Sequence, residues 1–433
     1  MTAIADGTDV RPPTALVRAA VEALATQFFE PLTVGDLLCD AWVGATAALV
    51  RDGRSFASLP PHYPADPAAA YALHDATFPT LEWLAGGPAS LDDVTTAALE
   101  ELLARRRDGH THLSPRGRFW GVEPDPASPA GWANRTFGMV LTDTPPLTVA
   151  DVVPRGPAQR AGLRRGQAVL AINGQPVAHL RRVQAAARLN WQPGAVTRLT
   201  VRGSGSEAID LELRSKLVPM PYTELLPGPF GLLRMDGFSG SAAETAALRA
   251  ALMSFEQAGA LGWIIDLRWC GGGPSIQLSR LLVSEGRLLS CQRHNEVYLL
   301  DGTVLPMRQD VDLDGTALPV QRPLVVLIGP GSVSGAESFA GPMQAYRRAT
   351  LVGERTAGMC GVVRSVTLAP GWTICLATHQ TDLGPGELRL NRIGVTPDVL
   401  STLTPNDEAA GRDPQLETAL QILRTQTIAH GEH

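Results

Sequence analysis

The chain has 433 residues, of which 44% are hydrophobic and 18% charged, and its formal net charge is −6. This composition can fill the cores of two or three domains and excludes a disordered chain. The acidic balance, without any basic stripe, argues against a nucleic acid as the main partner.

The chain start and the cysteines bear on where the protein works. Residues 1–11 lack a charged segment followed by an apolar run, and no apolar stretch approaches the roughly 18–20 residues of a membrane span. The cysteines form no Cys-x-x-Cys pair, which fits reduced thiols better than disulfides or a zinc site. We therefore expect a cytoplasmic protein without a membrane span, metal or cofactor. The cysteines are Cys39, Cys270, Cys291, Cys360 and Cys375.

Residues 1–125 are predicted to be a helical region that ends in a histidine-bearing segment. Proline-rich breaks at Leu59–Pro67 and Gly86–Ser90 separate its helices. Apolar residues recur at helical spacing in Leu16–Ala25, Val34–Val50 and Leu91–Arg107. The segment Asp108–His112 follows the last of these helices and carries His110 and His112.

A proline- and glycine-rich linker, Pro124–Trp132, leads into a domain of short strands at residues 133–216. Helical pieces are expected around Pro157–Ala161 and His179–Leu189. The predicted strands are Thr136–Thr142, Leu147–Val153, Ala168–Ile172, Arg198–Val201 and Ala208–Leu213.

After a second linker, Val218–Pro229, strands and helices alternate through a domain at residues 220–405. Such alternation predicts crossover connections and a mostly parallel sheet. The expected strands are Gly231–Met235, Gly262–Leu267 and Leu324–Ile328, and the helices are Ala242–Gln257, Ile276–Val283 and Ala336–Arg347. Residues 359–398 are strand-rich, and a helix at Pro414–Thr427 occupies the last region, 406–433.

Three motifs in residues 133–216 resemble a protease-associated PDZ domain. They are Phe137–Leu141 (Phe-Gly-Met-Val-Leu), Gly156–Gly166 and Val169–Gly174. The resemblance implies that an exposed sheet edge accepts a peptide as an extra strand and that loop N–H groups hold its terminal carboxylate. It places peptide binding at Phe137, Gly138, Met139 and Val140, with pocket side chains between Leu180 and Leu189. The alternative is a PDZ domain that serves only as a spacer or gate.

Two further motifs carry candidate chemistry. Asp266–Gly273 (Asp-Leu-Arg-Trp-Cys-Gly-Gly-Gly) ends an apolar strand, and its glycines allow close backbone approach and oxyanion-binding N–H groups. Gly331–Glu337 (Gly-Ser-Val-Ser-Gly-Ala-Glu) follows the apolar strand Leu324–Ile328. A serine on such a strand-to-helix turn is exposed at a helix N-terminus, although a helix-capping serine would look similar.

Together these motifs resemble the C-terminal processing protease and tricorn-like serine peptidase family. The resemblance covers about residues 95–405 and implies a crotonase-like (ClpP/crotonase-type) α/β core with an inserted PDZ domain. It makes Ser334 the nucleophile and Gly271, Gly272 and Gly335 the oxyanion hole. The family's Asp-Leu-Arg-x-Asn-x-Gly-Gly motif has asparagine where this chain has Cys270.

The general base departs from the processing-protease pattern. These enzymes use the lysine of Thr-Phe-Gly-Lys, and here the matching positions 356–359 end in Met359. The single lysine of the chain, Lys216, lies where the PDZ segment ends. Tricorn-like members use a histidine ahead of the PDZ domain, which corresponds to His110 here. Alternation along an extended segment does not separate His110 from His112, and the motif match favours His110.

A third group should orient the imidazole. The resemblance aligns the tricorn-type glutamate with Asn391, just before Gly394-Val395-Thr396-Pro397-Asp398, and Glu387 and Glu354 stay open as alternatives. We read His294 and His379 as structural.

The sequence thus predicts a serine-type endopeptidase with a Ser-His mechanism, acting on peptides or protein C-terminal tails. The alternative is a catalytically retired peptide- or ligand-binding member of the fold. The oligomeric state stays open, and the N-terminal helices are the candidate contact for a homo-oligomer.

Overall fold

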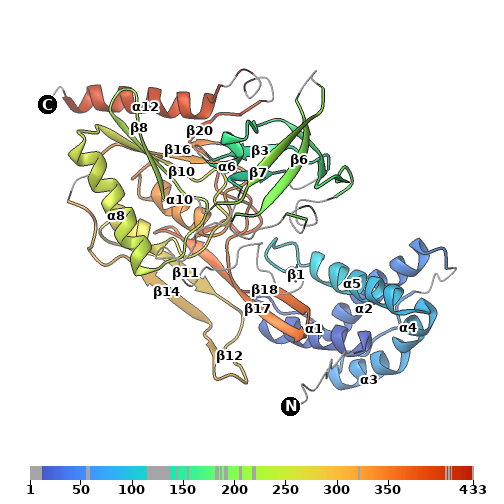
Figure 1. Ribbon diagram of the computed structural model, residues 1–433. Coiled ribbons are helices and arrows are strands. Elements are labelled where there is room, and N and C mark those ends of the chain that lie inside the picture. Colours follow the sequence, from blue (N-terminus) through green and yellow to red (C-terminus); the bar gives the residue numbers. More distant parts are fainter. Residues whose placement is uncertain are drawn as a thin grey trace, which may run out of the picture.

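The computed structural model describes most of the chain in three regions, namely N-terminal helices, PDZ strands and an α/β core (Figure 1). The described residues are 12–54, 59–114, 137–142, 145–153, 156–180, 185, 188–189, 194–203, 207–216, 221–319, 322–404, 407, 410 and 412–431. The predicted linker at 124–132, and most of the predicted helix at 179–189, fall outside them.

The core is built on a sheet whose strands run in the order β20-β16-β15-β10-β9-β8. All neighbours pair in parallel except β8 and β9, which confirms the predicted, mostly parallel sheet. The strands are β8 (Tyr222–Leu226), β9 (Phe230–Arg234), β10 (Gly262–Asp266), β15 (Leu324–Ile328), β16 (Thr350–Gly353) and β20 (Val399–Leu400).

Helices cover both faces of this sheet because its strands are apolar on both sides. One face packs on α8 (Ala242–Gln257), α9 (Ile276–Leu282) and α10 (Gly335–Ala345). The other face packs on the C-terminal helix α12 (Pro414–Gly431), which contacts β10, β15 and β16 and lies at the top of Figure 1. The result is a helix–sheet–helix sandwich. The glycine and serine motifs lie at the carboxyl ends of its parallel strands β10 and β15.

A second, antiparallel sheet runs in the order β1-β18-β11-β14, and β17 and β19 also pair with β18. Its long strand β18 therefore pairs with strands that are far apart in the sequence, from β1 to β19. The strands are β1 (His112–Ser114), β11 (Arg287–Gln292), β14 (Arg308–Asp312), β17 (Gly361–Ala369), β18 (Trp372–Leu383) and β19 (Leu388–Arg389). A small hairpin, β12 (Val297–Tyr298) and β13 (Val304–Leu305), projects beside it.

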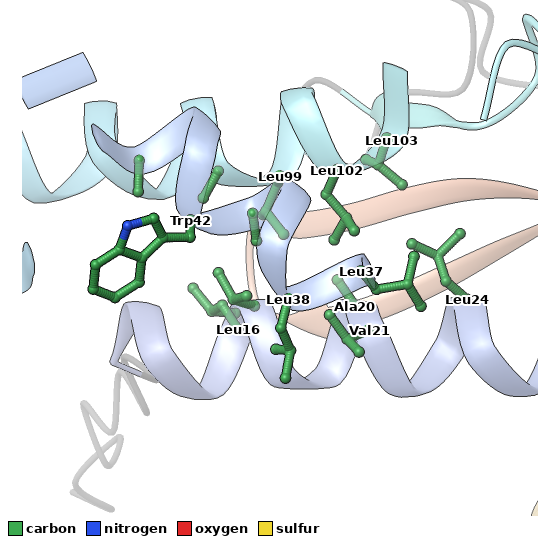
Figure 2. Close-up of a cluster of buried hydrophobic side chains, with 14 of the residues drawn as sticks. Leu16, Ala20, Val21, Leu24, Leu37, Leu38, Trp42, Leu99, Leu102 and Leu103 are labelled. Carbon is green, nitrogen blue, oxygen red and sulfur yellow. The ribbon is translucent and has the colours of Figure 1, made fainter. Parts of the chain in front are cut away.

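The N-terminal helices pack through leucine-rich faces. In Figure 2, Leu16, Ala20, Val21 and Leu24 of the first helix face Leu37, Leu38, Trp42, Leu99, Leu102 and Leu103 of two others. The same buried cluster includes Ile374 and Leu376 of β18 and Leu368 of β17. The helical region therefore shares its core with the peptidase part. The helices are α1 (Pro13–Gln27), α2 (Val34–Arg51), α3 (Pro67–Thr77), α4 (Pro79–Ala85) and α5 (Pro88–Ala104).

The PDZ segment has its own apolar core, formed by residues such as Phe137, Ile172 and Leu199. Its strands pair as β2 with β3 and as β5-β4-β6-β7. The elements are β2 (Met139–Leu141), β3 (Val149–Val152), α6 (Pro157–Arg160), β4 (Ala168–Ile172), β5 (Gln175–Pro176), β6 (Val196–Arg202) and β7 (Ile209–Arg214).

Buried charges join the PDZ segment to the core. Asp151 of β3 forms an ion pair with Arg234 of β9, and the exposed fraction of the two side chains is only 4% and 10%. Arg165 Nε lies 3.8 Å from the same aspartate and Arg165 Nη1 lies 4.0 Å from Asp413, just before α12. Asp413 also pairs with Arg268 of the glycine motif at 2.8 Å. The PDZ segment, the core and the C-terminal helix thus meet in one ionic cluster.

Two organisational predictions were wrong in part. The expected linker at 218–229 contains β8, whose alternating pattern allows it to pair with β9 at the sheet edge. The expected break at Gly86–Ser90 is shorter than predicted, because α5 begins at Pro88 and proline at the first helical position starts a helix as readily as it ends one. The other expected break, Leu59–Pro67, is confirmed, since α3 begins at Pro67 with Asp66 as its N-cap.

Candidate functional site

The serine motif forms a strained turn between β15 and α10. Ser334 has φ 55° and ψ −107°, a backbone conformation that a non-glycine residue rarely adopts. Ser332 supports the turn, since its Oγ donates to Leu267 O (2.8 Å) and accepts from Gly329 N (3.0 Å). Ser334 is half-buried at the N-terminus of α10. Ser334 thus caps α10 in a capping box with Glu337, and its strained strand-to-helix turn is also of the kind that presents a serine at a helix N-terminus.

The glycine motif lies directly against Ser334. A Cβ added to Gly272 would stand 2.7 Å from Cβ of Ser334, and one added to Gly335 would collide with Gly273 O. Val333 N also donates to Cys270 O (3.0 Å), which ties the two loops together. Only residues without a side chain allow this approach, so the structure brings the two motifs into contact.

The amide of Gly271 has a different task from the one predicted. Gly271 N donates to Asp236 O at 2.9 Å, so this N–H holds the loop and is not directed at a substrate oxyanion. The Gly272 N–H hydrogen-bonds to the thiol of Cys270, whose pKa is raised by burial. Gly335 is the first residue of α10, where backbone N–H groups face outward along the helix axis.

Glu337 connects the serine turn to the next loop. Its Oε2 accepts from Ser334 N (3.0 Å) and Met359 N (2.8 Å), and its Oε1 accepts from Thr356 Oγ1 (2.6 Å) and Gly358 N (2.7 Å). Burial raises the pKa of this carboxyl, and the four donors oppose that effect. One buried side chain therefore fixes the serine turn relative to residues 356–359.

His110 lies in the loop between α5 and β1 and is buried. The next strand, β1, is fixed by pairing with β18, where His112 is opposite Cys375. On the other side, a Cβ on Gly109 would stand 2.7 Å from Met359 Cγ, so the histidine loop packs on the loop that Glu337 holds. Contacts therefore run continuously from Ser334 to the histidine loop.

The environment of His110 favours a neutral imidazole. Burial, with a smaller effect of His112, lowers the pKa of His110 to about 4. Its Nδ1 is buried without a hydrogen-bond partner among the described residues. The Nδ1 of His112 is instead hydrogen-bonded to the carbonyl oxygen of His110 (2.8 Å), so the two rings have different surroundings.

Asn391 follows β19 and belongs to a segment that contacts both the serine-side and histidine-side loops. Its neighbour Arg392 donates its backbone N–H to Gly358 O (2.6 Å), and its side chain donates to Arg106 O (2.9 Å) just before the histidine loop. Within the described part of the chain, the buried Asn391 Oδ1 has no hydrogen-bond partner.

The alternative third groups have other surroundings. Glu387 forms a surface ion pair with Arg308 at 2.7 Å, and 47% of its side chain is exposed. The carboxyl pKa of Glu354 is raised by burial. His294 and His379 are hydrogen-bonded to the carbonyl oxygens of Phe29 and Pro306, as expected of structural histidines.

The predicted peptide-binding residues divide into two kinds. Phe137 is fully buried in the PDZ core, so its side chain cannot contact a peptide, and its carbonyl accepts from Ala158 N (2.7 Å). Gly138 has φ 71°, and Met139 and Val140 continue into β2, opposite Val152 and Asp151.

Lys216 is exposed directly after β7 of the PDZ segment. Among the residues that the structure describes, no group of three His, Cys, Asp or Glu side chains could hold a metal ion. No described helix is long and apolar enough to cross a membrane.

Comparisons with known proteins agree with the motifs. Residues 229–401 match peptidase family S41 and residues 148–203 match the PDZ domain. The chain is 26% identical over 367 residues to carboxyl-terminal-processing peptidase 2, chloroplastic, of Arabidopsis thaliana (78% of this chain, 68% of that protein). It is 28% identical over 347 residues to the carboxyl-terminal-processing protease of Synechocystis (76% of this chain, 77% of that protein).

The fold agrees as well. The structure is similar to the photosystem II D1 C-terminal processing protease, with a TM-score of 0.53, 22% identity, and coverage of 92% of this chain and 94% of that one. The described loops that carry Ser334 and the glycine motif lie within the matched peptidase segment. Residues 229–401 therefore form a peptidase domain of family S41, the serine peptidase family, with a PDZ domain before it, and the named relatives are carboxyl-terminal processing proteases.

Proposed function

We propose that the protein hydrolyses peptide bonds of peptides or protein C-terminal tails with Ser334 as nucleophile and His110 as general base. The observation that supports this most strongly is the strained Ser334 turn packed on Gly272 at the N-terminus of α10. Strain of this kind persists where the surrounding structure enforces it, and it clusters at reacting groups.

A histidine base is supported because neither position that could supply a lysine base, 359 or 216, is suited to that role. Met359 fills the place of the family lysine, and a thioether cannot accept a proton at neutral pH. Lys216 is exposed at the end of the PDZ segment. The histidine loop, in contrast, packs on Met359, which shares Glu337 with Ser334. His110 is therefore the base that the packing favours.

Asn391 is the proposed orienting group. A hydrogen bond from Nδ1–H of His110 to Oδ1 of Asn391 would satisfy two buried atoms that have no other partner in the described residues. An amide holds the ring tautomer but stabilises the imidazolium less than a carboxylate does. We propose Asn391 over Glu387, which is engaged with Arg308.

The reaction then follows acyl-transfer chemistry. His110 takes the proton of the Ser334 hydroxyl as Oγ bonds to the peptide carbonyl carbon, and the oxyanion is held at the N-terminus of α10, beside Gly272 and Gly335. The C–N bond breaks as the leaving amine takes the proton from the imidazolium. Water then hydrolyses the ester with His110 again as base, which releases the acid and restores Ser334.

For the PDZ segment we propose binding of a substrate C-terminus along β2, with main-chain contacts from Gly138, Met139 and Val140. Phe137 contributes only to the core that supports this strand.

The test is fluorophosphonate labelling of the purified protein, located by peptide mass mapping. We expect modification of Ser334 that His110→Ala slows by about 10³-fold, because an unactivated serine is a poor nucleophile. His294→Ala serves as the matched histidine control and Lys216→Ala as the test of a lysine base. Labelling that depends on Lys216 and not on His110 would overturn the mechanism.

A retired peptide binder is the second candidate, favoured by Met359, Cys270 and Asn391 at three positions where the family pattern has lysine, asparagine and glutamate. It predicts no labelling of Ser334, with or without added peptide, together with retained binding of peptides that end in a free carboxylate.

A further inference from the structure

The carboxylate of Asp108 holds the backbone of the histidine loop. Asp108 Oδ1 accepts from His110 N at 2.8 Å and from Thr111 N at 2.7 Å. The residue is only 2% exposed, and Gly109 between them turns the chain with φ 72°. The amide of His110 is therefore fixed by a side chain two residues earlier.

The loop is also fixed from its other end. Thr111 Oγ1 accepts from Ala377 N of β18 at 3.2 Å, and His112 begins β1 opposite Cys375. Between these anchors His110 has no side-chain hydrogen bond at Nδ1 among the described residues. Its position therefore depends on how its backbone is held.

The groups that face Asp108 come from three elements. They are Arg392 beside Asn391, Cys375 of β18, and His112 of β1. Burial raises the pKa of the Asp108 carboxyl, while the Thr111 and His110 donors and the charge of Arg392 oppose that effect. A buried carboxylate costs stability unless it is bonded, so its retention here is best explained by what its Oδ1 holds.

We infer that Asp108 is the positioning residue of His110. It touches neither substrate nor Ser334, and it acts by holding the His110 and Thr111 amides so that the imidazole is presented at one fixed place. The inference rests on the proposed function, in which His110 is the base. It predicts that the length of the side chain at position 108 matters more than its charge.

Two substitutions separate length from charge. Asp108→Asn keeps an acceptor oxygen at the same reach and removes the charge, so we expect kcat to fall by less than about tenfold. Asp108→Glu keeps the charge but displaces the acceptor by one methylene, and a displacement on the order of 1 Å lowers kcat by about 10²-fold. KM should stay near its original value in both variants, because substrate contacts are unchanged.

A matched control is available in the helical region. Asp66 Oδ2 likewise accepts from a backbone amide, Ala69 N, at 2.8 Å, but at the start of α3. Asp66→Glu therefore makes the same change without touching the histidine loop, and its kcat should match the parent protein. The melting temperatures of Asp66→Glu and Asp108→Glu are compared so that a fall in kcat is not attributed to unfolding.

The measurements are peptide hydrolysis and the rate of fluorophosphonate labelling of Ser334. The inference is overturned if Asp108→Glu retains the parent kcat, or if Asp108→Asn loses as much as Asp108→Glu. If Asp108→Glu does not fold, Asp108→Ala, which adds no bulk and removes both bonds, takes its place with the same expectation.

His110→Ala in the same assay distinguishes a failure of the proposed base from a failure of the role of Asp108. If His110→Ala labels normally, the proposed base is wrong. If His110→Ala fails to label while Asp108→Glu behaves like the parent protein, the base is supported and only the role of Asp108 is overturned.

Discussion

The helical region and the PDZ segment attach to the peptidase core by different forces. The helical region shares a continuous apolar cluster with β17 and β18. The PDZ segment has its own apolar core and meets the peptidase through Asp151, Arg165, Arg234 and Asp413.

This difference indicates different roles. Separating the helices from β17 and β18 would expose their shared apolar core to water and destabilise the fold. The helices are therefore part of the peptidase fold and hold the histidine loop against β18. A buried ion pair adds little net stability but fixes orientation, and breaking it on one side is costly. The PDZ segment is thus a separately folded unit held in one orientation.

The largest effect is expected from Asp151→Ala. Removing one partner leaves Arg234 as a buried charge, which costs about 3–5 kcal/mol of the free energy that holds this joint. Hydrogen exchange should show lost protection in residues 137–216 before the rest of the chain. The double variant Asp151→Leu/Arg234→Met removes both charges of this pair and should recover part of the loss, because Arg234 also stabilises the buried carboxylates of Asp236 and Asp266. Equal destabilisation of both variants would contradict the ionic description of this joint.

A comparable loss is expected from Leu376→Ala, in the apolar joint. Leu376 is fully buried where β18 meets the helices, and emptying such a site costs about 2–5 kcal/mol. Urea unfolding should show the helical region and the core losing stability together, with the same loss at low and high salt. Leu400→Ala, at an exposed position on β20, is the control and should change the free energy of unfolding by less than about 0.5 kcal/mol.

Lowering the pH should reduce the stability of the fold in two steps, first near the histidine loop and then where the PDZ segment meets the core. The pKa of His110 is about 4 when folded and near 6.5 when unfolded, so the unfolded chain binds a proton that the folded protein resists. Stability is therefore full above pH 6.5 and falls by about 3 kcal/mol as the pH drops toward 4. Asp266 interacts with Arg234 of the PDZ joint. Burial opposes ionisation of Asp266, but Arg268 holds its pKa well below the usual range. Its contribution persists until the pH falls below about 3.9.

Chemical denaturation between pH 4 and 7 checks this expectation. His110→Gln, which does not titrate, should lose less stability over that range than the parent protein. An identical pH profile for both proteins would show that the buried imidazole titrates normally.

The smallest effect is expected from Glu30→Gln. Glu30 forms a bidentate pair with Arg392 at 2.9 Å, but the two side chains are 41% and 37% exposed. Exposed pairs contribute less than about 1 kcal/mol, and salt screens them. The free energy of unfolding should therefore change little, and the difference should vanish in about 1 M salt. A larger or salt-independent loss would mean that this pair, and not the apolar cluster, joins the helices to the core.

Local patterns predicted much of the fold. The bounds of α8, β4 and β15 agree with their predicted ranges, because each is a complete apolar period with clear ends. The second sheet was harder to predict. Strands β11 and β14 are stabilised by pairing with each other and with the distant β18, and nothing in their own sequence specifies that partner.

The site shows the same division. Ser334 and Gly272 could be predicted to meet because both lie at the ends of neighbouring parallel strands. The hydrogen bond from Gly271 N to Asp236 O could not be predicted, because it depends on the conformation of the loop after β9. The hydrogen bonds of Glu337 and Asp108 were also beyond sequence reasoning, although the Asp-x-His spacing was a visible signal for Asp108.

The place of β1 beside β18 has a consequence for the newly made chain. The bond from Ala377 N to Thr111 Oγ1 joins residues 266 positions apart. At 5–20 residues per second, the ribosome needs roughly 15–50 seconds after the histidine loop emerges to supply its partner strand. On the proposed mechanism, a nascent chain therefore holds no working base during that interval and cannot cleave its neighbours on the polysome.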